Sequence, residues 1–315
     1  MSFAFVFPGQ GSQSVGQLAD FAAATEVREA FSEASAVLGY DLWALTQQGP
    51  AEQLNLSEFT QPAMLTAGVA LWRLWKGRGG ADPGEVSGHS LGEFSALVCA
   101  GALALGPAVD LVRFRGQVMQ EAVPAGTGAM AAILGLTDEQ VASCCDQAAQ
   151  GEVVEAVNFN SPGQVVIAGD RTAVERAIER CKTAGAKRAV PLALSVPSHC
   201  SLMGPAAERL ELRLQDVPFA KPSIRYVSAV DALPHSEPDD IRELLVRQLA
   251  SPVRWQDTVR ALAANGHAQL IECGPGKALT GLNRRIVKGP DLAFLALEDR
   301  VTFEAALAAT RFEHV

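Results

Sequence analysis

The sequence predicts an α/β protein that consists of a large domain with a mainly parallel sheet and a small domain inserted into it. Short apolar runs, which are typical of buried strands, alternate with segments of helical periodicity along most of the 315 residues. Residues 126–195 break this alternation and follow an order of their own. We therefore expect residues 1–125 and 196–315 to form the large domain, and residues 126–195 to form the small one.

Four short apolar segments are expected to be buried strands of the large domain: residues 3–7, 86–87, 224–227 and 269–273. No basic segment precedes the first of these strands, and the apolar run that contains it ends at residue 7. It therefore fits a core strand better than a signal peptide. Residues 62–75 are the most apolar later stretch, but Arg73 interrupts them and they are too few to cross a bilayer. We expect a buried helix there, with Pro62 in its first turn.

The small domain is expected to have the ferredoxin-like order strand, helix, strand, strand, helix, strand. Thr137 and Gln140 form a capping box that should start the first helix. Residues 158–163 are rich in turn-forming residues and should connect the central hairpin. The successive elements are expected at residues 129–134, 137–150, 153–157, 164–168, 171–184 and 188–194. A cleft is expected where this domain meets the large one.

Composition and charge exclude several classes of function. The chain has 26 basic and 35 acidic residues, a net charge of −9, which argues against a general affinity for nucleic acid or an anionic membrane. Its six cysteines show no C-x-x-C or metal-type spacing. We expect a cytoplasmic protein with reduced cysteines, no disulfide and no structural metal.

Residues 88–93, with the sequence GHSLGE, contain a G-x-S-x-G motif between an expected strand and an expected helix. In that context the motif predicts a nucleophile elbow that exposes the hydroxyl of Ser90, as in the α/β-hydrolases. The amide of Leu91, at the positive end of the helix, could hold an oxyanion. The ordinary alternative is a helix-capping serine in a glycine-rich turn. The strand–turn–helix context favours the nucleophile and an α/β-hydrolase-like large domain.

A nucleophilic serine needs a base, and His199 is the best candidate because it lies where the small domain rejoins the large one. His89 adjoins Ser90 but is expected to point away from it. The remaining histidines lie in connections or at the chain end: His235, His267 and His314. Because no acidic residue fits as a third member, a backbone carbonyl could orient the imidazole instead.

Two further features fit a site in the cleft. Residues 8–13 (PGQGSQ) follow the first strand, but they lack the lysine of a P-loop and the spacing of a dinucleotide fingerprint. We interpret them as a second backbone donor near Ser90. Arg113 and Arg115 lie on an expected helix, residues 109–121, where arginines are usually solvated. An arginine turned into the cleft would instead bind a carboxylate through two hydrogen bonds.

Eight motifs in order resemble those of the bacterial malonyl-CoA:acyl-carrier-protein transacylases of type II fatty acid synthesis, and the resemblance covers essentially the whole chain. They lie at residues 7–13, 60–63, 88–93, 115–120, 126–130, 158–163, 196–199 and 274–276. The resemblance implies that Ser90 is the nucleophile and His199 its base. It also implies that Arg115, rather than Arg113, binds the malonyl carboxylate.

The same resemblance assigns the surroundings of these residues. The backbone amides of Gln10 and Leu91 would form the oxyanion hole, and the main-chain carbonyl of Gln248 would orient the histidine. Gln61 and Asn160 match family positions near the pocket. One departure is expected to be harmless: a phenylalanine, residue 94, stands where many relatives have tyrosine.

The implied reaction is a ping-pong transfer of malonyl from malonyl-CoA to the phosphopantetheine thiol of acyl carrier protein, without a cofactor and by a monomer. Five basic residues are candidates for docking this acidic partner: Lys187, Arg188, Arg284, Arg285 and Lys288. A serine hydrolase, either an α/β-hydrolase-like esterase or a patatin-like lipase, shares the elbow but leaves Gln10 and Arg115 unexplained. A non-catalytic module that binds carrier protein is the third alternative.

Overall fold

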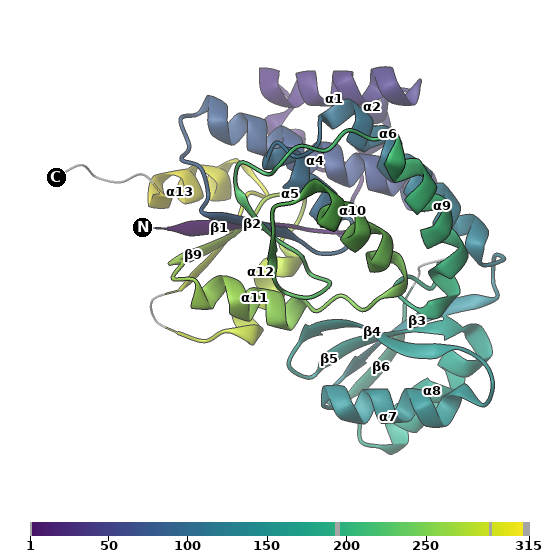
Figure 1. Ribbon diagram of the computed structural model, residues 1–315. Helices are drawn as coiled ribbons and strands as arrows, with labels where there is room; N and C mark the ends of the chain where they lie inside the picture. Colours follow the sequence, from purple (N-terminus) through teal and green to yellow (C-terminus); the bar gives the residue numbers. More distant parts are fainter. Residues whose placement is uncertain (1, 193–195, 290–291, 311–315) are drawn as a thin grey trace.

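The computed structural model describes residues 2–192, 196–289 and 292–310. Its larger sheet has the strand order β10-β9-β1-β2-β7-β8 and is parallel except at β8, which pairs antiparallel with β7 (Figure 1). The six strands are β1 (Phe3–Phe7), β2 (Glu85–Gly88), β7 (Arg225–Val227), β8 (Pro234–His235), β9 (Gln269–Glu272) and β10 (Ala293–Ala296).

All four strands predicted for the large domain are present; β1 has the predicted ends, and no end of the other three differs by more than one residue. The sequence did not predict β8 and β10, which form the two edges of the sheet. A strand at an edge is covered on fewer sides than a central one, so its apolar signal is weaker. The two residues of β8 are too few to show any alternation.

Helices cover both faces of this sheet (Figure 1). They are α1 (Thr25–Leu38), α2 (Leu42–Gln48), α3 (Ala51–Leu54), α4 (Ser57–Gly77), α5 (Gly92–Cys99), α6 (Leu105–Ala122), α9 (Gly204–Gln215), α10 (Pro238–Arg247), α11 (Trp255–Ala264), α12 (Ala278–Ile286) and α13 (Arg300–Thr310). Short 3₁₀ turns are η1 (Ala19–Phe21), η2 (Ser201–Met203) and η3 (Gln248–Ala250). No helix in the described part of the chain is long and apolar enough to cross a membrane.

The predicted position of Pro62 in a first helical turn is wrong. Helix α4 begins at Ser57, so Pro62 lies inside it and leaves one carbonyl of the preceding turn without its usual amide donor. The early start has a local cause, because Glu58 provides an acidic side chain at the positive end of the helix.

The smaller sheet is antiparallel with the order β4-β5-β3-β6, and the fold of its segment is ferredoxin-like, as predicted. Its elements are β3 (Gly128–Leu134), α7 (Asp138–Ala149), β4 (Val154–Ser161), β5 (Gln164–Asp170), α8 (Arg171–Thr183) and β6 (Arg188–Pro191). Helices α7 and α8 pack on one face of the sheet and enclose a separate hydrophobic core (Figure 1). The capping box of Thr137 and Gln140 is formed. Residues 193–195, where the last strand and the small domain were expected to end, lie outside the described residues.

One connection in the small sheet differs from the prediction. Residues 158–163 are not a loop, because Asn158, Phe159 and Ser161 continue β4 and pair with β5. The hairpin turns only at Pro162 and Gly163. The longer strand also reaches the large domain, where the amide of Phe159 donates to the carbonyl of Val253 at 3.0 Å. Strand β4 therefore connects the small sheet to the large domain and carries Asn158 and Asn160 to their junction.

Candidate active site

Ser90 lies on a tight turn between the end of β2 and the start of α5. Its φ is 53°, an unusual value for a residue with a side chain and the one expected at a nucleophile elbow. Glycine is required on both sides of it. A Cβ at Gly88 would lie 1.9 Å from a Gly92 backbone atom, and one at Gly92 would lie 2.0 Å from the Phe7 carbonyl oxygen. The motif thus presses the turn against β1 and makes Ser90 project from it.

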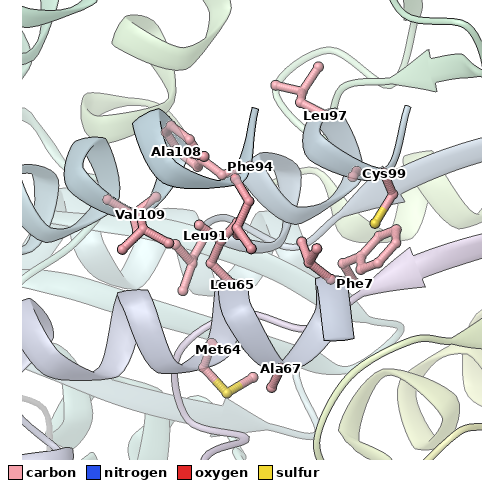
Figure 2. Close-up of a cluster of buried hydrophobic side chains, with 14 of the residues drawn as sticks. Phe7, Met64, Leu65, Ala67, Leu91, Phe94, Leu97, Cys99, Ala108 and Val109 are labelled. Atoms are coloured by element: carbon pink, nitrogen blue, oxygen red, sulfur yellow. The ribbon is translucent and has the colours of Figure 1, made fainter. Parts of the chain in front are cut away.

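Buried side chains next to Ser90 hold this turn in place. Leu91 and Phe94 are almost fully buried and belong to one hydrophobic cluster with Leu65 of α4 and Val109 of α6 (Figure 2). Since the residues that flank the serine are fixed on the side facing the core, the serine itself is directed the other way. The elbow is therefore rigid before any substrate binds.

His199 lies beside Ser90, although 109 residues separate them. The Ser90 Oγ–His199 Nε2 distance is 2.7 Å, and His199 Nδ1 lies 2.8 Å from the main-chain oxygen of Gln248. A carbonyl only accepts hydrogen bonds, so Nδ1 carries the proton and Nε2 is free to accept from the serine hydroxyl. The backbone amide of His199 also donates to the carbonyl of Leu249 at 3.0 Å. The imidazole is held in the tautomer that a general base requires.

The surroundings of His199 keep it neutral. Burial, reinforced by the positive charge of Arg115, lowers the pKa of His199 from 6.5 to about 3. At neutral pH the imidazole is therefore free to take a proton.

Arg115 is fully buried on α6 and points into the same site. Its Nη1 donates to Gln61 Oε1 at 2.9 Å, and its Nη2 donates to Gln248 Oε1 at 2.9 Å and to Ser90 Oγ at 3.3 Å. Gly116 allows α6 to approach α4, because a Cβ there would lie 2.6 Å from Ser57 backbone atoms. That close crossing brings Arg115 to Gln61, which is one turn further along α4.

Among the residues that the structure describes, no carboxylate forms a salt bridge with Arg115. Burial lowers its pKa to about 10, so it remains charged at neutral pH. Its Cζ lies 5.6 Å from the centre of the Phe94 ring, a contact that a tyrosine ring could also make. Arg115 Nε is buried and has no hydrogen-bond partner among the described residues. Buried donors are rarely left in this state, so an anionic ligand would complete the site. Arg113, by contrast, pairs with Asp110 at 2.5 Å on a partly exposed face.

The amides of Gln10 and Leu91 are in position to serve as donors. Both residues line the small pocket that contains Ser90, and within the described chain neither amide donates to another protein group. The side chain of Gln10 is turned to Ser57, at 3.3 Å. Two unused backbone N–H groups beside a serine hydroxyl are the components of an oxyanion hole.

The pocket around Ser90, His199 and Arg115 has a volume of only about 50 Å³ and opens into a cleft of about 640 Å³ between the two sheets. His89 lines the pocket, but no hydrogen bond joins its side chain to Ser90 among the described residues. Its Nε2 is 2.8 Å from Asn160 Oδ1, and its ring lies 5.5 Å from that of Trp255. His89 is therefore part of the pocket wall, and Asn160 lines the adjoining cleft.

Sequence reasoning missed two side chains at this site. Gln248 was expected to act through its backbone alone, but its carboxamide also contacts Arg115 and donates to the main-chain oxygen of Ser90 at 3.1 Å. Glu93 belongs to the elbow motif, but no role was predicted for it. Its buried carboxylate accepts a hydrogen bond from the Gln248 side chain. One signal in the sequence could have indicated Glu93: it is an acidic residue in the first turn of α5, which is otherwise mostly apolar.

The described residues contain no group of three histidine, cysteine or acidic side chains placed to hold a metal ion. All six cysteines are buried and unpaired. A larger hollow of about 1050 Å³ lies along the outer faces of α7 and α8, but neither Ser90 nor any histidine lines it. The reactive groups converge at the elbow.

Comparison with known proteins agrees with this geometry. The profile of the acyl transferase domain family matches residues 4–292. The malonyl CoA-acyl carrier protein transacylase of Escherichia coli is 59% identical over 306 residues, which are 97% of this chain and 98% of that protein. A crystal structure of an acyl carrier protein S-malonyltransferase from Vibrio cholerae superposes with a TM-score of 0.94 at 56% identity, over 97% of this chain and 100% of the other.

A second solved structure is informative about assembly. It shows a type II PKS acyl-carrier protein in complex with its malonyl-transacylase, and it matches this chain with a TM-score of 0.96 at 54% identity, covering 98% of this chain and all of the other. An α/β fold with a serine elbow, an adjoining histidine and an inserted ferredoxin-like unit defines the class of serine acyltransferases. The chain belongs to the malonyl CoA-acyl carrier protein transacylase family.

Proposed function

We propose that this protein transfers the malonyl group from malonyl-CoA to the phosphopantetheine thiol of acyl carrier protein, by way of a malonyl ester on Ser90. One observation carries the proposal. The Ser90 hydroxyl is 2.7 Å from a neutral imidazole and 3.3 Å from a buried arginine whose Nε has no hydrogen-bond partner in the described part of the chain. A nucleophile and a carboxylate receptor side by side fit an acyl group that ends in a carboxylate.

In the loading half-reaction, His199 Nε2 takes the proton of Ser90 Oγ while that oxygen attacks the thioester carbonyl of malonyl-CoA. The amides of Gln10 and Leu91 stabilise the oxyanion, a contribution typically worth about 10²–10³ in rate for each donor. The C–S bond then breaks, and the imidazolium gives its proton to the coenzyme A thiolate. The carbonyl of Gln248 stabilises the imidazolium while it exists.

In the transfer half-reaction the same groups act in reverse. His199 takes the proton of the phosphopantetheine thiol, whose sulfur attacks the ester carbonyl on Ser90. Collapse of the second tetrahedral intermediate breaks the C–O bond, and Ser90 recovers its proton from the imidazolium. Arg115 holds the malonyl carboxylate in both halves, so a donor without a carboxylate loses this interaction.

The cleft between the sheets suits the long thiol arm that both substrates share. It runs past Gln10 and Asn160 towards Arg285 on α12, where it reaches the surface. All five basic docking candidates are exposed: Lys187, Arg188, Arg284, Arg285 and Lys288. We place the acidic carrier protein on this rim, with its arm in the cleft.

The remaining parts of the proposal follow from the same site. Residues 126–195 act as a domain that forms one wall of the cleft, which its separate core supports. A monomer suffices, since every residue assigned to the chemistry comes from one chain. No cofactor is needed, because the steps above move only protons and an acyl group. Six buried, unpaired cysteines are consistent with work in the cytoplasm.

Intact-mass measurement after mixing with malonyl-CoA tests the proposal directly. We expect one malonyl adduct, mapped to Ser90, which disappears when holo acyl carrier protein is added. Steady hydrolysis of malonyl-CoA without carrier protein, as fast as transfer, would instead establish a serine hydrolase. Absence of any acyl adduct would establish a binding module.

A further inference from the structure

Glu93 occupies an unusual position for a carboxylate, because it is completely buried and forms no salt bridge with any basic side chain that the structure describes. Its Oε1 accepts from the hydroxyl of Ser228 at 2.9 Å and from the backbone amide of Ala229. Its Oε2 accepts from Nε2 of Gln248. Three donors therefore converge on one carboxylate in the first turn of α5, three residues after Ser90.

The Gln248 carboxamide continues this chain of hydrogen bonds to Arg115. Its Nε2 donates to Glu93 and, at 3.1 Å, to the Ser90 carbonyl, while its Oε1 accepts from Arg115 Nη2 at 2.9 Å. Because the Glu93 carboxylate and the Ser90 carbonyl are both acceptors, the NH₂ group of the Gln248 side chain must face them. The oxygen must then face the guanidinium.

We propose that Glu93 is a positioning residue for substrate selection, which acts through the Gln248 carboxamide to hold Arg115 where it receives the substrate carboxylate. The inference rests on the proposed function. It adds that selection depends on a carboxylate that touches neither the substrate nor Arg115. The negative charge also offsets that of Arg115, which is buried without a carboxylate of its own.

The variant Glu93→Gln tests the donor and acceptor order of these hydrogen bonds, with almost no change in the shape of the side chain. Glutamine has one acceptor oxygen, and the backbone amide of Ala229 cannot rotate away, so that oxygen must stay with Ala229 and Ser228. The new NH₂ then faces Gln248 Nε2, donor against donor. Gln248 can relieve this only by turning over, which presents its NH₂ to Arg115 and its oxygen to the Ser90 carbonyl. Arg115 loses its support.

The chain provides a matched control in Glu272, at the end of β9. It is also fully buried, and burial raises the pKa of both glutamates to about 7. Glu272 accepts from the amides of Leu279 and Thr280 at the start of α12 and has no hydrogen bond to Gln248 or Arg115. Glu272→Gln therefore makes the same chemical change at a site outside the hydrogen bonds that link Glu93, Gln248 and Arg115.

The experiment measures loading of Ser90 from malonyl-CoA and from acetyl-CoA in wild type, Glu93→Gln, Glu272→Gln and Arg115→Ala. We expect Glu93→Gln to raise KM for malonyl-CoA by about tenfold or more, as for a weakened hydrogen bond to a charged group, with acetyl loading within about threefold of wild type. Glu272→Gln should leave the ratio of the two donors unchanged. An equal fall with both donors in Glu93→Gln, or an unchanged ratio, overturns the proposal.

The design separates this inference from the proposed function. If wild type forms no malonyl ester, or Arg115→Ala leaves the donor ratio unchanged, the proposed function fails and not merely the role of Glu93. Acetyl loading and a thermal melt report whether each variant folds. Should Glu93→Gln not fold, Gln248→Met removes the carboxamide while keeping the backbone carbonyl that orients His199. It must show the same loss of malonyl preference, and a preference like that of wild type overturns the proposal.

Discussion

The two ends of the pocket are held in different ways. At the proposed reacting end, Ser90 and His199 both adopt positive φ, 53° and 68°, and His199 is fixed by the carbonyls of Gln248 and Leu249. At the proposed carboxylate-binding end, Arg115 is fixed by the side-chain carboxamides of Gln61 and Gln248. Backbone groups build the first end, and side chains build the second.

This difference predicts which function is easily changed by mutation. Main-chain contacts survive most substitutions, so the chemistry should tolerate changes of neighbouring side chains, apart from the glycines of the elbow, and should fail when Ser90 or His199 is replaced. The orientation of Arg115 depends on particular side chains, so substrate choice should change without loss of the ester-forming step. Carrier-protein docking, at the exposed rim, should be separable from both.

Ser90→Ala should have the largest effect, because it removes the atom that forms the ester. Covalent loading should vanish with malonyl-CoA and acetyl-CoA alike, and transfer should fall by about 10⁴-fold or more. Intact-mass spectrometry and a transfer assay measure both. Ser95→Ala changes a buried serine on the following helix, α5; it is the control and should still load. A malonyl group mapped to any other residue of the Ser90→Ala protein would refute the assignment.

Arg115→Ala should separate the two ends. Malonyl loading should fall by about 10- to 150-fold, the equivalent of about 1.5–3 kcal/mol for a lost charge-assisted hydrogen bond, while acetyl loading changes little. Competition between the two donors, read by mass, measures the ratio. Arg113→Ala, two residues away and paired with Asp110, should leave that ratio unchanged. Equal losses with both donors would show that Arg115 serves the structure and not selection.

The pH dependence should also differ between the ends. The pKa of His199 is lowered to about 3, so the base stays neutral and acetyl loading should vary little between pH 8 and pH 5. Burial raises the pKa of Glu93 to about 7, so Glu93 is protonated below that pH and loses an acceptor for Gln248. Arg115 and Tyr226, the titratable groups around it, do not change charge in this range, since their pKa values lie at about 10 and well above 10.

Malonyl preference over acetyl should therefore decline as pH falls through 7. At pH 6 about a tenth of Glu93 is ionised, so the preference should be up to about tenfold lower than at pH 8. Rapid-quench loading with both donors measures this, and Glu93→Gln should show no such dependence. A limb near pH 6.5 that is equal for both donors would mean that His199 titrates normally.

The smallest effect is expected at the rim. Arg284→Glu combined with Lys288→Glu reverses two exposed charges and leaves Arg285, which lines the cleft, unchanged. Transfer to carrier protein should fall several-fold, up to about tenfold, mainly through slower association, and added salt should reduce the difference. Loading from malonyl-CoA should stay within about twofold. The matched control is Arg28→Glu combined with Lys76→Glu, which reverses two exposed charges on α1 and α4. A parallel fall in loading, or no effect at any salt concentration, places docking elsewhere.

Local sequence determined the elbow and the central strands. The pattern at residues 88–93 specifies its turn because Gly88 and Gly92 are needed for close contacts within the motif itself or with the adjacent β1. The strands β1, β2, β7 and β9 are short and almost entirely buried, and each contains apolar residues, so the sequence alone could indicate their burial. The capping box at Thr137 is likewise complete within four residues.

The site itself was decided only by the tertiary structure. Glu93 and Gln248 meet across 155 positions, and His89 meets Asn160 across the junction between the sheets. The periodicity of the sequence cannot predict such pairs, because each depends on how segments that are distant in the chain pack together. The same holds for the pKa values, since burial lowers that of His199 to about 3 and raises that of Glu93 to about 7. Sequence alone determined which residues could react, and folding decided what surrounds them, because desolvation and hydrogen-bond partners are supplied by segments far away in the chain.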